Sequence, residues 1–268
     1  MNALCQMTGL SRAGFYRWRV PRQAMPVEME IRDQMQKVAL ESPAYGYRRI
    51  TAELQKRGFD VNHKHILRMM REDNLLCVRR PAFVVTTDSR HNLPIYPNLA
   101  REIKPTTINQ LWVADITYIR LRTEFVYLAV VLDAFSRRVI GWALGRTLEA
   151  GLAVTALRMA LIQRQPAPGL VHHSDRGVQY ASQDYTEMLK QHQATISMSR
   201  KGNPYDNAAC ESFMKTLKYE EVYRNEYRDF HEAYSSIGEF LERVYNQKRL
   251  HSALGYVPPA EFENGATP

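Results

Sequence analysis

The sequence predicts an α/β domain with a mixed five-stranded sheet and flanking helices, preceded by a small all-α region. Helical periodicity dominates residues 27–74, whereas the chain from Asn109 onward begins with three strand-like segments. Two further strand-like segments then alternate with helices. Consecutive strands followed by alternating helices and strands are typical of a mixed sheet in an α/β domain.

Residues 1–78 are predicted to be a helical region of the helix-turn-helix type. A short opening segment is followed by a turn and by a second helix that Ser11 can cap. A longer helix is predicted from about Val27 to Leu40, and two more helices on either side of a turn at Gly58. Asn62 is the expected N-cap of the last helix.

Basic side chains are concentrated in the first part of the chain. The net charge is +8; residues 1–108 hold 18 Lys and Arg against 10 Asp and Glu, and residues 109–268 hold 18 against 18. This division indicates a DNA-binding module beside a neutral catalytic module. A basic surface that only keeps the protein soluble fits the charge equally well.

The predicted DNA contacts lie on two neighbouring helices. Lys64, Arg68 and Arg71 share one face of the last helix of this region, and aliphatic side chains point elsewhere. A helix that packs on one side and meets phosphates on the other needs this arrangement, although a solvated amphipathic helix also has it. Arg48 and Arg49, at the start of the preceding helix, complete the set.

Residues 79–108 are predicted to be a linker with one short strand at residues 82–86. No apolar run approaches the ~20 residues that a membrane-spanning helix needs. The N-terminus lacks the apolar region of a signal peptide. The three cysteines form no CxxC motif and no zinc-like spacing with histidine, which indicates a reduced compartment such as the cytoplasm.

Five strand-like segments are predicted after residue 109. They are LWVADITYIRL and EFVYLAVVLDAF, joined by a hairpin at Arg122-Thr123, followed by RRVIGWALG, GLVHHSD and ATISMSR. Helices are predicted at residues 148–163, at residues 182–191, around Glu211, and at about residues 229–245. One stripe of the last helix is predicted to be core and comprises Phe230, Tyr234, Ile237, Leu241 and Val244.

Three acidic residues are the candidate metal ligands: Asp115 within a strand, Asp175 at the end of a strand, and Glu211 on a helix. A carboxylate among the apolar neighbours of Asp115 is costly unless it is paired or bound to a metal. Ligands bind at the carboxyl ends of strands in α/β sheets, where Asp175 is expected. Because Mg²⁺ binds through a few carboxylates and substrate phosphates, the three acids predict metal-assisted phosphodiester chemistry.

Each acid also has a simpler interpretation. Asp115 fits a strand-edge residue bonded to backbone, Asp175 a turn residue before glycine, and Glu211 a surface ion pair with Lys215. At about 100° per residue, however, Glu211, Lys215 and Lys218 form one stripe, which suits a metal ion beside a DNA backbone. The neighbouring stripe is apolar and comprises Cys210, Phe213, Met214 and Leu217.

The sequence contains WVADITYI, VVLDAFSRRVIGW, HHSDRGVQY, GNPYDNAACESFMKTLK and YNQKRLHSALGYVPPAEF, which span about residues 110–263. In these strings the chain resembles the DDE transposases with a retroviral-integrase-type core, specifically the second-frame protein of IS-three-like insertion sequences. AYGYRRITAELQKRG resembles the helix-turn-helix segment that precedes the core in that family.

The resemblance implies an RNase-H-like fold for residues 109–268 and a Mg²⁺-dependent polynucleotidyl transferase that cuts element ends and joins them to target DNA. It assigns catalysis and metal binding to Asp115, Asp175 and Glu211, with two Mg²⁺ ions (or Mn²⁺) per site. It assigns DNA contact to Lys215 and Lys218. It further implies a homo-oligomer on the terminal repeats and target DNA, in the cytoplasm with the nucleoid. Because no zinc module or leucine zipper is recognisable, a fused upstream-frame segment is an additional expected partner.

Three other functions remain open from the sequence. His173 and Arg176 spell an HxxR motif, with Tyr205 and Tyr219 downstream as nucleophiles of a covalent recombinase, but this motif ends a strand. A DNA-binding regulator with an inactive core is the second alternative, and an RNase-H-like nuclease without joining activity is the third. The segment NQKRLH at residues 246–251 is expected to be basic and exposed.

Overall fold

The computed structural model describes residue 11 and residues 26–75, 94–200 and 207–266. The helices predicted before residue 26, the strand predicted at residues 82–86, and Tyr205 lie outside the described residues. The chain divides into two compact units, Met1–Cys77 and Val78–Pro268.

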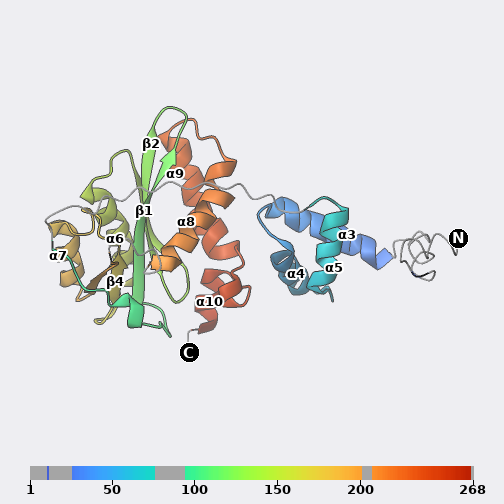
Figure 1. Ribbon diagram of the computed structural model, residues 1–268, viewed down its shortest axis with the longest axis horizontal. Coiled ribbons are helices and arrows are strands. Elements are labelled where there is room, and N and C mark those ends of the chain that lie inside the picture. Colours follow the sequence, from blue (N-terminus) through green and yellow to red (C-terminus); the bar gives the residue numbers. More distant parts are fainter. Residues whose placement is uncertain (1–10, 12–25, 76–93, 201–206, 267–268) are drawn as a thin grey trace. The chain divides into compact units, whose positions relative to one another are not determined.

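The described part of the N-terminal unit consists of α3 (Pro26–Glu41), α4 (Tyr47–Lys56) and α5 (His63–Glu72), drawn in blue to cyan in Figure 1. Asn62 caps α5 as predicted, because its side-chain oxygen accepts hydrogen bonds from the backbone N–H groups of Lys64 and His65 at 3.1 and 2.9 Å. Gly58 has a φ of 90° in the turn between α4 and α5, a conformation that favours glycine. The buried apolar side chains of these helices are Ile31, Met35, Val38, Ile50, Leu54, Ile66, Met69 and Met70.

One five-stranded sheet forms the centre of the C-terminal unit. β1 (Leu111–Arg120), β2 (Phe125–Asp133) and β3 (Val139–Gly145) pair antiparallel, and β4 (Val171–Ser174) and β5 (Thr195–Met198) pair parallel. The strand order is β3-β2-β1-β4-β5, with β4 parallel to β1. The predicted mixed five-stranded sheet and the predicted hairpin between its first two strands are therefore confirmed.

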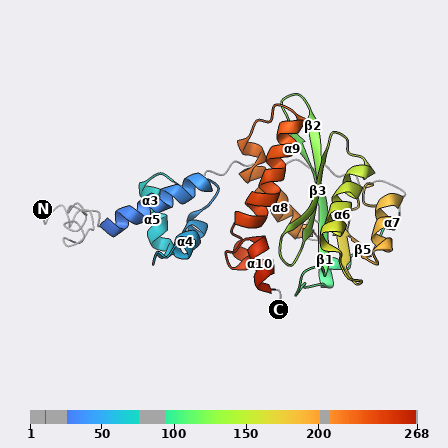
Figure 2. The ribbon, with the colours of Figure 1, turned by 180° about the vertical axis from the view of Figure 1, so that it is seen from behind.

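Helices cover both faces of this sheet, as the two opposite views in Figures 1 and 2 show. They are α6 (Ala150–Arg164), α7 (Gln183–Gln191), α8 (Ala208–Glu220), α9 (Phe230–Glu239) and α10 (Pro259–Ala266), with short 3₁₀ turns at Ala100–Glu102, Val222–Arg224 and Ser252–Leu254. Trp112 and Ala114 of β1 join the core that includes α6, whereas Leu111 and Val113 join the core that includes α8 and α9. Because side chains alternate along a strand, odd-numbered positions of β1 face α8.

Helix α9 continues directly into a π-helical segment, Phe240–Lys248. The stripe predicted for a single regular helix is core only in part. Ile237 and Leu241 are fully buried, whereas Tyr234 and Val244 are 46% and 37% exposed, so the prediction is wrong for these two. A π-helix forms i→i+5 hydrogen bonds, which shifts the buried position from Val244 to Tyr245.

Buried polar contacts join the last part of the chain to the sheet. Glu263 of α10 accepts hydrogen bonds of 2.6 Å from the Ser136 hydroxyl and from the Arg138 guanidinium, and it pairs with Arg164 of α6. Asn246 donates to the backbone carbonyl of Val139 at 2.9 Å and accepts from its N–H at 3.0 Å. These contacts attach α10 to the β2–β3 turn and the π-helical segment to the start of β3.

The segment NQKRLH is not the exposed basic surface that the sequence predicts. Arg249 is buried and donates to both carboxylate oxygens of Glu220 on α8, at 2.7 and 2.8 Å. Asn246 and Leu250 are buried as well, and Gln247 and Lys248 are exposed. The arginine is inside because a carboxylate 29 positions earlier neutralises it, a pairing that local sequence does not show.

Part of the predicted linker belongs to the C-terminal unit and packs against its sheet. The backbone N–H of Leu99 donates to the Ser197 hydroxyl at 2.8 Å, and the N–H of Met198 donates to the Pro97 carbonyl at 3.3 Å. Residues 97–99 therefore lie along β5. Among the described residues, no helix is both long enough and apolar enough to cross a membrane.

Candidate active site

The parallel pairing of β1 with β4 places two of the three candidate acids at one level of the sheet. The last paired residues are Val113 and His173. Asp115 and Asp175 each lie two residues beyond this pair, and a step of two residues returns a side chain to the same face. The two carboxylates therefore lie on neighbouring chain segments, about 5 Å apart in the spacing of strands, on the face that α8 covers.

The Asp115 carboxyl group lies in an unfavourable place for a charge. It is half-buried and accepts a hydrogen bond from the backbone N–H of Ile116 at 2.8 Å. Burial and the nearby Asp175 carboxylate, with a smaller contribution from Glu211, raise the pKa of Asp115 to about 7. The positive charge of Lys218 acts in the opposite direction. The pKa of Asp115 thus reflects its burial and the charges of the two other acids.

Asp175 begins a tight turn at the end of β4. One of its carboxylate oxygens accepts a hydrogen bond from the backbone N–H of Gly177 at 2.9 Å. A Cβ atom at Gly177 would lie 3.0 Å from that same oxygen and 3.0 Å from the side chain of Gln179, so glycine keeps the turn compact. The interpretation of Asp175 as a turn residue is therefore correct for one of its oxygens. This hydrogen bond fixes the direction in which the carboxylate points.

Helix α8 brings Glu211 to the same face of the sheet. Asn207, the residue just before α8, donates from its side chain to the backbone carbonyl of Ala114, next to Asp115, at 3.2 Å. Glu211 lies in the first turn of α8 and is exposed. The predicted apolar stripe of this helix is buried and comprises Cys210, Phe213, Met214 and Leu217.

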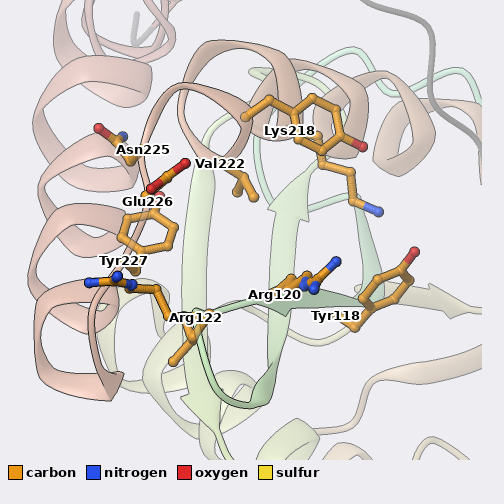
Figure 3. A pocket seen from close by; sticks show the side chains of 10 residues that line it. Tyr118, Arg120, Arg122, Lys218, Val222, Asn225, Glu226 and Tyr227 are labelled. Atoms are coloured by element: carbon orange, nitrogen blue, oxygen red, sulfur yellow. The ribbon is translucent and has the colours of Figure 1, made fainter.

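The two lysines of α8 differ in their surroundings. Lys215 is exposed, whereas Lys218 is half-buried with its ammonium group 4.8 Å from the centre of the Tyr118 ring (Figure 3). Burial lowers the pKa of Lys218, and the negative charge of Asp115 opposes this effect. Lys218 therefore lies between the Asp115 carboxylate and the ring of Tyr118, near the end of β1.

The three acids suit a hard divalent cation by their chemistry, since each supplies carboxylate oxygens. Among the described residues, no three His, Cys, Asp or Glu side chains are grouped closely enough to hold a metal ion by themselves. Mg²⁺ is commonly bound through one or two carboxylates together with water and substrate phosphates. The raised pKa of Asp115 adds a second indication, because a cation would relieve the repulsion among the three acids.

The predicted DNA contacts of the N-terminal unit are not equivalent. Lys64, Arg71 and Arg48 are exposed, and Arg49 is half-buried with its guanidinium 5.5 Å from the Tyr45 ring centre. Arg68 instead pairs with Glu28 at 3.0 Å and with Glu72 at 2.9 Å. Its charge is therefore already paired with carboxylates of the same unit.

His173, the histidine of the HxxR motif, is buried and contacts side chains next to it in the sheet. Both ring nitrogens of His173 lie within hydrogen-bond distance of serine hydroxyls, 2.8 Å from Ser197 and 3.0 Å from Ser199. Arg176 donates to the Ser199 backbone carbonyl at 2.7 Å. These groups fasten β4 to β5, an arrangement that gives no support to a covalent recombinase.

Two features of the site are not apparent from the sequence alone. Asn207 precedes an apolar helix and has the appearance of an ordinary N-cap, yet its amide bonds to β1. Tyr118 and Arg120 lie beyond Asp115, near the end of β1, and line a pocket with Lys218. The sequence signal for this pocket was the presence of polar side chains in the second half of an otherwise apolar strand.

Comparisons with known proteins agree with this arrangement. Residues 105–204 and 192–259 match two family models that are both described as an integrase core domain, and residues 26–83 match an HTH-like domain. A chain of a simian T-cell lymphotropic virus intasome aligns with a TM-score of 0.51 and 15% identity, over 88% of this chain and 75% of that chain. The likeness supports the integrase-type fold.

Two relatives extend over nearly the whole chain. The insertion element IS600 uncharacterized 31 kDa protein of Shigella sonnei is 40% identical over 266 residues, which is 97% of each chain. Transposase InsF for insertion sequence IS3A of Escherichia coli (strain K12) is 35% identical over 270 residues, 98% of this chain and 94% of that protein. The chain therefore belongs to the family of DDE transposases with an integrase core that IS3-like insertion sequences encode.

Proposed function

We propose that this transposase cuts DNA at the ends of its insertion element and joins the resulting 3′-hydroxyl groups to target DNA. Asp115, Asp175 and Glu211 bind two Mg²⁺ ions, which Mn²⁺ can replace. The observation that carries the proposal is the β1–β4 register, which puts Asp115 and Asp175 at one level under the first turn of α8. When bound there, the ions would supply activation of the attacking oxygen and stabilisation of the leaving oxygen.

The side chains around the acids prepare the site for DNA. Gly177 orients Asp175, and the Ile116 N–H orients Asp115, each through one hydrogen bond. Lys215 and Lys218 face the backbone of the element end and offset the charge of its phosphates. Lys218 is additionally held by the Tyr118 ring, so less side-chain freedom is lost when it binds.

The N-terminal unit binds the terminal repeats in this proposal. Lys64 and Arg71 of α5, together with Arg48 and Arg49 of α4, contact phosphates. Several copies of the chain assemble on the two element ends and the target, because both ends must be joined together. A segment from the upstream reading frame supplies further DNA or protein contacts.

The central test replaces one acid. Asp115→Asn is expected to reduce cleavage and joining by about a thousandfold or more, which corresponds to the several kcal/mol that metal-assisted charge stabilisation supplies. Binding to the element end should change little, because Asp115 donates nothing to the DNA. Cleavage and joining are measured on labelled element-end duplexes with Mg²⁺ and with EDTA, and binding by fluorescence anisotropy. Asp184→Asn, an exposed acid on α7, is the matched control.

Metal binding is measured separately from activity. Titration of Mn²⁺ followed by electron paramagnetic resonance should show binding to the wild type and much weaker binding to Asp175→Asn. Equal binding by both proteins, or loss of DNA binding in Asp115→Asn, would refute the metal assignment. Cleavage without joined products would indicate a nuclease, and a phosphotyrosyl–DNA adduct would indicate a covalent recombinase. DNA binding by the wild type without any Mg²⁺-dependent cleavage would indicate a regulator.

A further inference from the structure

A pocket of about 450 Å³ lies beside the candidate active site, between the far end of β1 and the turn that follows α8. Its volume is within the range of about 300–1,000 Å³ that small-molecule sites occupy, so one nucleotide fits. Figure 3 shows Lys218 and Arg120 extending toward Tyr118 at one end, with Arg122 and Tyr227 at the other. Tyr223 also lines the pocket.

The lining carries a strong positive charge. Arg120, Arg122 and Lys218 contribute three cations, against the single acid Glu226. Neither Arg120 nor Arg122 has an ion-pairing or hydrogen-bonding partner for its guanidinium among the residues that the structure describes. Guanidinium groups in such a place bind phosphate well, because phosphate oxygens accept two parallel hydrogen bonds.

Aromatic rings accompany these cations. Tyr118, Tyr223 and Tyr227 line the same pocket. Tyr223 is 42% exposed, although it also touches the Tyr219 ring edge-on with centroids 5.7 Å apart. Exposed aromatic rings next to basic side chains are the usual means of holding unpaired bases, since every base can stack on a ring. A base reaches a pocket of this kind only when it has left the duplex stack.

We propose that this pocket holds an unpaired nucleotide of the DNA near the reacting phosphate, with its base on Tyr223 and its phosphate on Arg120 and Arg122. Lys218 joins the pocket to the acids. Glu211 and Lys218 are seven residues apart on α8, which is about 10 Å along the helix, or roughly three stacked nucleotides. The inference rests on the proposed function, because it assumes that DNA passes over the three acids.

The experiment measures how the full chain distinguishes single-stranded from paired DNA. The probes are a fluorescein-labelled 20-base-pair duplex with blunt ends and the same duplex with a four-thymidine 3′ extension. In EDTA, the wild type is expected to bind the extended duplex about tenfold more tightly, the size of one base stacked on an aromatic ring. Tyr223→Ala should abolish this preference and leave binding to the blunt duplex unchanged, whereas Tyr223→Phe should retain it.

Matched controls separate the pocket from general effects. Tyr234→Ala removes a tyrosine of similar exposure from α9, and Arg158→Ala removes an exposed arginine from α6 on the other face of the sheet. Both should keep the preference, whereas Arg120→Ala should reduce it. A 2-aminopurine base placed in the extension should lose fluorescence on binding to the wild type and to Tyr223→Phe, but not to Tyr223→Ala.

The outcomes distinguish this inference from the proposed function. Loss of the preference in Tyr234→Ala, its persistence in Tyr223→Ala, or its absence in the wild type would overturn the pocket assignment, whatever the activity. A preference that disappears in Tyr223→Ala supports the pocket even if no joined products form with Mg²⁺. In that case the catalytic proposal fails and the nucleotide site remains.

Discussion

Asp115 lies among buried side chains of β1, and burial, together with the nearby Asp175 and Glu211 carboxylates, raises its pKa to about 7. Its neighbours Ala114 and Val113 are almost completely buried. A charge in this place opposes folding, since neither water nor a counter-ion compensates it fully. The structure therefore keeps a carboxylate where an uncharged residue would be more stable, which is typical of functional sites.

At pH 8 in EDTA, Asp115→Asn is expected to raise the free energy of unfolding by about 2 kcal/mol, a value reduced for partial exposure. The amide keeps the size of the side chain and carries no charge. Thermal denaturation of the variant and the wild type measures the difference. Asp184→Asn, which removes an exposed charge, should change stability by less than about 0.5 kcal/mol. A melting temperature for Asp115→Asn below that of the wild type would contradict the expectation.

Close contact between β3 and α6 depends on one residue without a side chain. A Cβ atom at Gly141 would lie 2.2 Å from the backbone oxygen of Ala156 and 2.9 Å from the Cβ of Ala160. The strand and the helix thus touch through their backbones. This contact brings the helix close enough to cover the face of the sheet opposite α8.

Gly141→Ala is expected to destabilise the C-terminal unit by about 1–3 kcal/mol or more, because strand and helix must separate to admit the methyl group. Gly151→Ala is the matched control, since a Cβ atom there meets nothing within 4 Å. That control should leave stability unchanged or increase it by up to about 1 kcal/mol through better helix propensity. Equal melting temperatures for the two variants would show that α6 moves away without cost.

The basic side chains of α5 should separate into two groups. Lys64→Ala and Arg71→Ala are each expected to weaken binding to element-end DNA and to reduce the slope of log K against log salt by about 1. Arg68→Ala should instead lower thermal stability, because Glu28 and Glu72 each lose one of their ion-pair partners. Anisotropy titrations at several salt concentrations measure the slopes. A slope change for Arg68→Ala equal to that for Lys64→Ala would place Arg68 on the DNA.

Elements were predictable where the sequence pattern is local. The strands around Asp115, the cap at Asn62 and the apolar stripe of α8 follow from periodicity within a few residues. The level of Asp115 beside Asp175 was not predictable, because it depends on the register of two strands far apart in sequence. Arg249 was misplaced for the same reason, since Glu220 lies on another helix. The three acids could be chosen as a set, but not their arrangement.

One buried acid, Glu263, connects three parts of the C-terminal unit. Glu263 connects α10 with the β2–β3 turn through Ser136 and Arg138, and with α6 through Arg164. Burial alone would raise the pKa of Glu263, but the hydrogen bonds from these three partners outweigh it and lower the pKa below 4.5. A folded-state pKa below the unfolded value means that ionisation of Glu263 stabilises the fold.

This stabilisation is fully present above about pH 4.5 and is lost as the pH falls through the lower pKa of the folded state. Glu263→Gln is therefore expected to cost about 3–5 kcal/mol at pH 7, because two arginines lose their partner, and progressively less below pH 4. Denaturation curves from pH 3 to pH 7 measure the effect. Glu239→Gln, which breaks an exposed pair with Arg243, should cost less than about 1 kcal/mol at every pH. A penalty for Glu263→Gln that does not depend on pH would refute the linkage.

The position of Glu263 also affects how decayed copies of such a mobile element should be interpreted. A stop codon between codons 211 and 263 leaves all three acids encoded but removes the carboxylate that neutralises Arg138 and Arg164. Such a gene product retains the three acids and lacks the ion pairs that connect α10 with α6 and with the β2–β3 turn. An intact acidic triad in a genome is therefore insufficient evidence that a copy can still move, and codon 263 should be inspected as well.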